Sequence, residues 1–435
     1  MRLEGHGLLR FANVNFIGSA FKAGPIFLYP FRKEGTKNLK TKEKEVNIMK
    51  KLAALAMALT MAVTGLTGCG GSETAAPSEG GKEKVVIGGS GPLTGNYATY
   101  GISVRQGGLL AANEINAAGG VNGLELEFLF EDNEADATKS VSSYNILMDK
   151  GMNVSLGGTT SGCTIADAEE AHKDGILLLT PSGSQKECTK YDNAFRVCYM
   201  DPDLGFYSAN FIKENNMASK VAILYEKSND YSAGVTEAFL KQAEAAGLEV
   251  VSQQAFTDQS NTDFSVQLQA VKSSGAELLF MPIYAQEAAY VLTQAGKMEL
   301  DMTFFGADGM DGIIEKIGEE NLKYAEGLIL LTPYSADSTE EPTASFVKNY
   351  KAAYNDQVPD QFAADSYDAV YTIAECLKKT GAKPSDKDFN EKMIGAMTEV
   401  EVKGVTGTMV WSADGEPTKP AKAVKIVDGA YKEFK

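Results

Sequence analysis

The feature that most constrains the fold of this chain is a repeated alternation of short apolar segments with longer amphipathic ones. The first run predicts strands at 84–89, 124–130, 153–157 and 176–180 and helices at 102–117, 136–149 and 164–173. The pattern then restarts, with strands at 220–225, 248–255, 277–281 and 303–306 and helices at 232–246, 262–274 and 285–296. Such alternation predicts parallel sheets with helices on both faces. The strands are too many for one small sheet, so we expect an α/β fold of two doubly wound parallel-sheet lobes.

Composition excludes several classes of function. The 435 residues carry a formal net charge of −17, which argues against binding to nucleic acid, because phosphates need a basic partner. The chain has 2 histidines, which leaves little room for a His-based metal site or a Ser-His-Asp triad. Its 5 cysteines do not suggest a disulfide scaffold or a zinc ribbon. We therefore predict no metal and no cofactor.

A targeting segment precedes the alternating region. Residues 49–68 combine a basic start, an apolar run and small residues, and they read as a signal peptide. The run Leu66-Thr67-Gly68-Cys69 resembles a bacterial lipobox, in which the cysteine is lipidated; the alternative is a buried apolar helix with a chance cysteine. We expect lipidation at Cys69 and attachment to the extracytoplasmic face of the cell membrane.

Two segments flank this signal. Residues 1–48 precede a complete signal peptide, so we interpret them as an upstream over-extension of the reading frame, with translation starting at Met49. Residues 69–83 are small, polar and rich in glycine, and they predict a flexible tether.

Strand-end loops carry the candidate binding chemistry, because ligands bind at the carboxyl ends of parallel strands. The loop 157–164 is rich in glycine, serine and threonine, and a helix begins next to Ser161. A helix N-terminus with nearby hydroxyls suits a carboxylate or phosphate. Ser182 and Ser184 follow the neighbouring strand and would add donors. The alternative is that Ser161 caps its helix and the other serines form turns.

Several motifs in order carry a family resemblance: Ser90 to Gly95, Glu131 to Asn133, Gly175 to Pro181, Phe305 to Gly309 and Gly404 to Gly407. Together they resemble the periplasmic leucine/isoleucine/valine-binding protein family of ABC-transporter receptors, which has a type I periplasmic binding fold. This resemblance spans about residues 84–435 and implies two lobes joined by a three-segment hinge. It places lobe 1 at 84–200 and 334–404, and lobe 2 at 201–333 and 405–435, with Gly407 to Trp411 and Ala423 to Val427 as added strands of lobe 2.

The resemblance also implies roles for four polar residues. Ser161 matches the residue that holds the ligand carboxylate through its hydroxyl and amide. Ser184 matches a residue that serves the carboxylate and faces the ammonium. Ser182 lies where a backbone carbonyl accepts from the ammonium, and Asp308 lies where an acidic residue pairs with it. Burying either charge without a partner would be costly, so both partners are required.

Five more residues match the walls of the family's site. Tyr231 and Tyr284 match aromatic residues of lobe 2 that cover the ligand, and Tyr100 matches one on the other wall. Thr159 and Thr160 lie where relatives have a more apolar pair against the ligand side chain. Without the resemblance, core packing would be the simpler interpretation of each tyrosine.

These features predict a lipid-anchored, monomeric solute-binding protein and not an enzyme. We expect it to capture an amino acid, neutral or branched-chain, and to deliver it to an ABC permease. The alternatives are a receptor for another small carboxylate or amide, and a sensory or adhesion module. A hydrolase with Ser161 as nucleophile is disfavoured, because no G-x-S-x-G elbow surrounds it and His172 is the only histidine after the signal segment.

The remaining cysteines are open to two interpretations. Cys188 and Cys198 flank a predicted loop and would be able to form a disulfide outside the cytoplasm, but sequence gives no geometry, so both states stay open. Cys163 and Cys376 are expected to be small buried residues.

Overall fold

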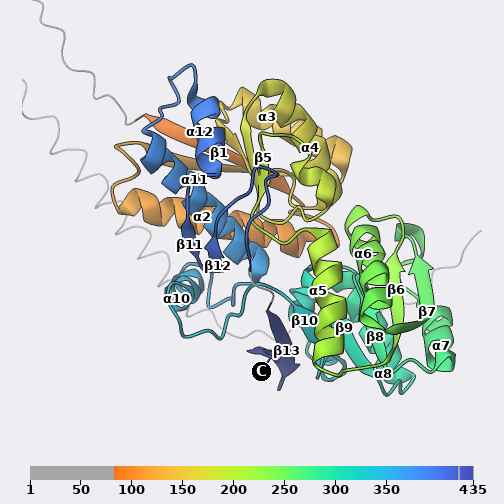
Figure 1. Cartoon of the computed structure of the whole chain (residues 1–435). Coiled ribbons are helices and arrows are strands. Elements are labelled where there is room, and N and C mark those ends of the chain that lie inside the picture. Colours follow the sequence, from red (N-terminus) through yellow and green to blue (C-terminus); the bar gives the residue numbers. More distant parts are fainter. Residues whose placement is uncertain (1–82, 420–421, 435) are drawn as a thin grey trace, which may run out of the picture. The chain divides into compact units, whose positions relative to one another are not determined.

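The computed structural model describes residues 83–419 and 422–434 (Figure 1). The predicted over-extension 1–48, the signal peptide 49–68, the lipidation site Cys69 and the tether up to residue 82 lie outside the described residues. Within the described part, none of the helices has both the length and the apolar character needed to cross a bilayer.

The first sheet has five parallel strands in the order β2-β1-β3-β4-β5. Its strands are β1 (Lys84–Gly91), β2 (Glu125–Asp132), β3 (Val154–Ser155), β4 (Leu177–Thr180) and β5 (Ala194–Arg196). The helices that pack on it are α2 (Ala98–Ala117), α3 (Ala137–Asp149), α4 (Ser161–Asp174), α11 (Gln361–Thr380) and α12 (Phe389–Met397). Most of these elements lie within a few residues of their predicted positions, whereas β5, α11 and α12 were not predicted.

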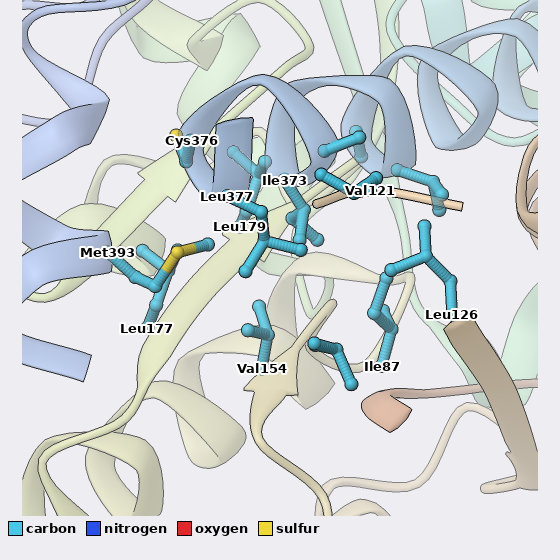
Figure 2. Close-up of a cluster of buried hydrophobic side chains, with 14 of the residues drawn as sticks. Ile87, Val121, Leu126, Val154, Leu177, Leu179, Ile373, Cys376, Leu377 and Met393 are labelled. Carbon is cyan, nitrogen blue, oxygen red and sulfur yellow. The ribbon is translucent and has the colours of Figure 1, made fainter. Parts of the chain in front are cut away.

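Two hydrophobic clusters cover the two faces of this sheet. On one face, Ile87 and Leu179 of the strands pack against Ile373 and Leu377 of α11, as Figure 2 shows. On the other face, α3 and α4 pack through residues such as Leu147. The apolar runs of the strands are thereby buried on both sides, as expected for a parallel sheet.

The second sheet has seven strands in the order β14-β13-β10-β9-β8-β6-β7. Its strands are β6 (Lys220–Glu226), β7 (Glu249–Phe256), β8 (Leu278–Met281), β9 (Thr303–Gly306), β10 (Ile329–Leu331), β13 (Ala423–Val427) and β14 (Ala430–Glu433). The neighbouring strands β10, β9, β8, β6 and β7 are parallel, and β13 and β14 add antiparallel pairs. The predicted strand at Ala423–Val427 is therefore confirmed.

Helices cover both faces of the second sheet as well. They are α5 (Asp201–Glu214), α6 (Asp230–Ala246), α7 (Ser265–Ser274), α8 (Ala285–Lys297) and α9 (Ile313–Ile317). Along β6, Val221 and Ile223 belong to the cluster under α5 and α6, whereas Ala222 and Leu224 belong to the cluster under α7 and α8. This two-residue alternation is what a strand buried on both faces requires.

Shorter elements complete the described chain. They are α10 (Thr343–Ala353), β11 (Val402–Gly404), β12 (Gly407–Met409) and the 3₁₀ turns η1 (Lys186–Thr189), η2 (Asp258–Ser260), η3 (Asp308–Met310) and η4 (Leu322–Tyr324).

The prediction that Gly407 to Trp411 joins the second sheet is wrong. Residues 407–409 form β12, which pairs only with β11 in a separate two-stranded sheet. Met409 and Trp411 are buried in the core of the first sheet, and the Trp411 indole N–H donates to the Arg196 carbonyl at 2.7 Å. The buried indole needs an acceptor, and the end of β5 supplies it. The lobe boundaries themselves stay a prediction.

Candidate functional site

The loop between β3 and α4 forms one wall of the site. Thr159 adopts a left-handed backbone with φ of +67°, which is rare for a β-branched residue. Its hydroxyl donates to the Ser90 carbonyl at 2.8 Å, and its own carbonyl accepts from the Ser182 hydroxyl at 2.7 Å. These bonds hold a strained turn in place, as is common at binding sites.

Ser161 is the first residue of α4, and Thr160 occupies the N-cap position without a side-chain capping bond. The interpretation of Ser161 as a capping residue is therefore wrong. Its hydroxyl accepts from the backbone N–H of Gln185 at 3.2 Å and lies 3.5 Å from the Ser184 hydroxyl. The first amides of a helix have no carbonyl of their own helix to bind. Hydroxyls and amides thus converge here, as a carboxylate site requires.

A buried arginine holds the loop that carries Ser182 and Ser184. The Arg196 guanidinium donates to the carbonyls of Gly183 at 2.9 Å and Gln185 at 3.1 Å. It also pairs with Glu416 at 2.9 Å. The arginine is fully buried, so these bonds are shielded from water and fix the loop.

The four described cysteines, Cys163, Cys188, Cys198 and Cys376, are free and buried. The disulfide considered for Cys188 and Cys198 is therefore absent, whereas the predicted burial of Cys163 and Cys376 is confirmed. The Cys188 thiol lies 3.6 Å from the Ser161 carbonyl, and Arg196 provides the cross-links that a disulfide would have given this loop.

The opposite wall follows β9. Asp308 opens η3 and is 4% exposed. Its Oδ1 accepts from the Tyr231 hydroxyl at 2.9 Å and from the Gly309 N–H at 2.8 Å. Burial raises the pKa of Asp308 to about 7, although these two bonds act in the opposite direction. Within residues 83–419 and 422–434 no lysine or arginine forms an ion pair with Asp308.

Aromatic rings close the site between the two walls. Tyr231 and Tyr284 stack with ring centroids 5.3 Å apart and planes inclined by 6°. Tyr100 packs edge-on against Phe362 at 4.7 Å. The Tyr100 hydroxyl donates to the Gly309 carbonyl at 2.6 Å and accepts from the Ala285 N–H at 2.8 Å. Tyr100 of the first lobe therefore binds backbone groups of the second.

All nine predicted site residues line a single cavity. It has about 300 Å³ of empty volume, counting the space that is open to solvent. Its lining is Tyr100, Thr159, Thr160, Ser161, Ser182, Ser184, Tyr231, Tyr284, Asp308, Gly309 and Phe362. The structure thus brings together residues as far apart in the sequence as Tyr100 and Phe362; what each does to a ligand stays a prediction.

Sequence reasoning missed three residues at or beside the cavity. Gly309 follows Asp308 in the motif from Phe305 to Gly309, whereas Phe362 lies on α11, which does not follow a strand. Asp201 opens α5, and its N–H donates to the Ser184 carbonyl at 2.8 Å. Asp201 is fully buried, and burial raises its pKa well above the ordinary range.

No group of acidic, histidine or cysteine residues suited to a metal ion occurs in the described part of the chain.

Two α/β lobes with a cavity lined by residues of both define a binding protein of the type I periplasmic fold. The family described as "Periplasmic binding protein" matches residues 84–430, and the chain belongs to it. The predicted family and fold are confirmed. Members of this family are substrate-binding proteins rather than enzymes, and membership implies an extracytoplasmic location.

Individual relatives agree with this assignment. The chain is 28% identical to the leucine-, isoleucine-, valine-, threonine-, and alanine-binding protein of Pseudomonas aeruginosa over 302 residues, which cover 68% of this chain and 79% of that protein. It is 28% identical to the Leu/Ile/Val-binding protein BraC3 of Rhizobium johnstonii over 338 residues, with coverages of 77% and 89%.

Solved structures extend the comparison. LivJ of Streptococcus pneumoniae, a branched-chain amino acid transporter substrate binding protein in complex with isoleucine, gives a TM-score of 0.73 at 27% identity, with coverages of 80% and 98%. A solute binding protein of R. palustris in complex with benzoate gives 0.72 at 20% identity, with coverages of 80% and 95%, and its likeness concerns the fold alone.

Proposed function

We propose that this protein captures a neutral or branched-chain amino acid between its lobes and delivers it to an ABC permease. In this proposal the ligand carboxylate binds the hydroxyls of Ser161 and Ser184 and the first amides of α4. The ammonium binds the Asp308 carboxylate and the Ser182 carbonyl.

The observation that carries the proposal is the separation of hydrogen-bond donors and negative charge across one cavity. Ser161 and Ser184 offer hydrogen-bond donors on one wall, and Asp308 offers a buried carboxylate on the other. An α-amino acid supplies the matching pair of charges, which removes the cost of burying Asp308 alone. Several relatives are named as proteins that bind leucine, isoleucine or valine, which favours the same ligand class.

The cavity walls suit a small side chain. Tyr100, Tyr231 and Tyr284 offer rigid apolar area with polar tips, which suits a compact aliphatic group. Thr159 and Thr160 make the adjoining wall partly polar, so the pocket need not be purely aliphatic. A thermal-shift screen of the twenty amino acids tests the proposal, because a ligand that binds only the folded protein raises its melting temperature.

A second candidate is a receptor for a small carboxylate without an amine. The fold neighbour in complex with benzoate favours it, since the wall of Ser161 and Ser184 would hold such a carboxylate equally well. Asp308 separates the two candidates. An amino acid should bind at least about thirtyfold more tightly than the acid that lacks its amine, because an acid leaves Asp308 unpaired. Equal affinities would favour the second candidate, and binding to neither would favour a sensory or adhesion module.

We also propose that the protein is a monomer anchored through lipid on Cys69. Metabolic labelling with a radioactive fatty acid tests the anchor. The label should be incorporated into the wild-type protein and lost in Cys69→Ala, and equal labelling of both would contradict the anchor.

A further inference from the structure

One loop of the first lobe reaches two helices of the second lobe beside the cavity. The Tyr97 hydroxyl donates to Oε1 of Glu287, on the first turn of α8, at 3.0 Å. The neighbouring Asn96 carbonyl accepts from Nζ of Lys316, on α9, at 2.6 Å. None of these four residues lines the ligand cavity, so the ligand-binding roles proposed above leave them unexplained.

Each hydrogen-bond donor to Glu287 contributes strongly, because its buried carboxylate has few partners. Its side chain is fully buried, and its Oε1 accepts a second bond from the Asn261 amide at 3.1 Å. Its Oε2 has no hydrogen-bond partner in the part of the chain that the structure describes. Burial, and with it the negative charge of Glu226, raises the pKa of Glu287, and Lys316 is a cation near enough for Glu287 to act on its pKa. A buried carboxylate with so few partners depends strongly on each one.

Tyr97 also connects this contact to the ligand wall. Its ring packs edge-on against the ring of Tyr284, with 5.3 Å between the ring centroids, and Tyr284 lines the cavity. Tyr97 further lines an adjoining hollow of about 500 Å³, which shares Thr160 and Tyr284 with the cavity. The tyrosine therefore stands beside the ligand site and contacts both lobes.

We propose that Asn96, Tyr97, Glu287 and Lys316 form a latch between the lobes that holds the cavity shut and sets how fast a ligand leaves. Tyr97 acts here as a positioning residue, since it touches Tyr284 and not the proposed ligand. Only the identity of the released ligand rests on the function proposed above.

The structure offers a reporter of closure that needs no ligand. Ala285 is the first residue of α8, so its N–H has no acceptor within its own helix. It donates instead to the Tyr100 hydroxyl of the other lobe at 2.8 Å. Protection of the Ala285 amide from hydrogen exchange therefore requires the two lobes to be closed.

The test compares Tyr97→Phe with the wild-type full chain and with Tyr290→Phe. The first variant keeps the ring of Tyr97 and removes its hydroxyl. The control removes the hydroxyl of Tyr290, an exposed residue of α8, the helix that carries Glu287. Burial raises the pKa of Glu287 to about 7, so the comparison is made at pH 8, where Glu287 is charged. Without ligand, the Ala285 amide should then exchange about tenfold faster in Tyr97→Phe, which is the lower end for a hydrogen bond to a charged group. Lys316→Met keeps the aliphatic stem and removes the ammonium, and it should also speed the exchange of the Ala285 amide.

A second arm measures dissociation of the best amino acid from the thermal-shift screen by stopped-flow. The dissociation rate constant should rise about tenfold in Tyr97→Phe and stay unchanged in Tyr290→Phe. The latch is refuted if the Ala285 amide exchanges at the same rate in Tyr97→Phe and in wild type. It is also refuted if Tyr290→Phe speeds this exchange as much as Tyr97→Phe does. If no amino acid binds but exchange responds to Tyr97→Phe, the latch stands and the proposed function fails.

Discussion

Replacing Asp308 by asparagine tests the charge pairing on which the proposed ligand depends. Both hydrogen bonds from Tyr231 and Gly309 end on Oδ1 of Asp308, so Oδ2 is the oxygen available to an ammonium. An asparagine keeps an acceptor for those two bonds and replaces the second oxygen by an amide group. The variant therefore removes the charge while preserving the shape of the wall.

The expected loss of affinity is large because the carboxylate is only 4% exposed. Truncating one partner of a buried, hydrogen-bonded charge pair costs about 2–5 kcal/mol. Since about 1.4 kcal/mol is a factor of ten, Asp308→Asn should weaken amino-acid binding by about thirtyfold to several thousandfold. Isothermal titration calorimetry measures this loss directly.

Asp368→Asn provides a matched control. Asp368 is also a buried carboxylate, but it accepts from the backbone of Val405 and Thr406 and does not line the cavity. The control should lose stability and keep its affinity for the amino acid. A change of less than about threefold in Asp308→Asn would refute the ammonium-pairing argument.

The same variant separates loss of binding from loss of folding. Burial raises the pKa of Asp308 from 3.8 to about 7, so above pH 7 the unliganded folded protein holds a carboxylate at a cost that the unfolded chain avoids. Asp308→Asn removes that cost. The unliganded variant should therefore melt at a higher temperature than wild type at pH 8, and this difference should shrink as the pH falls toward 4. A lower melting temperature at pH 8 would contradict this linkage.

Further predictions follow from the same contacts. Affinity for the amino acid should fall by up to about tenfold per pH unit below pH 7, because Asp308 must lose a proton to pair with an ammonium, and calorimetry at several pH values would expose a flat profile. Ser161→Ala should weaken binding by about five- to thirtyfold through loss of one hydrogen bond, and unchanged calorimetric affinity would remove Ser161 from the site. Arg196→Met should lower the free energy of unfolding by about 2–4 kcal/mol in urea titrations, because three or more buried hydrogen bonds are lost, and a loss below about 0.5 kcal/mol would contradict its role in holding the loop. Reductant should leave the melting temperature unchanged, because Cys188 and Cys198 are free, and a clear fall would indicate a disulfide.

The sequence predicted most elements between residues 84 and 306, with β5 and α5 as exceptions, because the apolar runs of the others are short and end at turn-forming residues. The left-handed Gly175 after α4 and Gly247 after α6 are examples of such ends. The site converged for a related reason: Ser161, Ser184 and Asp308 each follow a parallel strand, and the carboxyl ends of such strands meet at one edge of each sheet.

Helix α11 shows why the later part of the chain was harder to predict. It is buried on most sides, and Asp365, Ser366 and Asp368 are among its buried residues. These polar residues lie among strongly periodic apolar ones, so the helix itself carries a pattern, but it follows another helix and not a strand. Phe362, at the start of this helix, was missed as part of the cavity because the site was predicted from strand-end loops alone.

Contacts between distant segments could not be read from local patterns at all. Met409 and Trp411 are buried in the core of the first sheet by partners far away in the sequence, such as the Arg196 carbonyl, 215 positions earlier, which accepts from the Trp411 indole. The Tyr97–Glu287 contact likewise joins residues 190 positions apart. No periodicity within either segment contains this information.

We expect the buried carboxyl groups at and beside the empty cavity to oppose its closure, and this opposition would make closure depend on the ligand. Asp308 and Asp201 are both buried, burial raises the pKa of each, and the negative charge of Asp308 further raises that of Asp201. In the proposed scheme an ammonium offsets this cost, whereas the latch formed by Tyr97 and Glu287 stabilises closure whether or not a ligand is bound. A stronger latch would close the protein without cargo, and a weaker one would release the cargo too soon. The two contributions must therefore be of similar size for the lobes to respond to an amino acid.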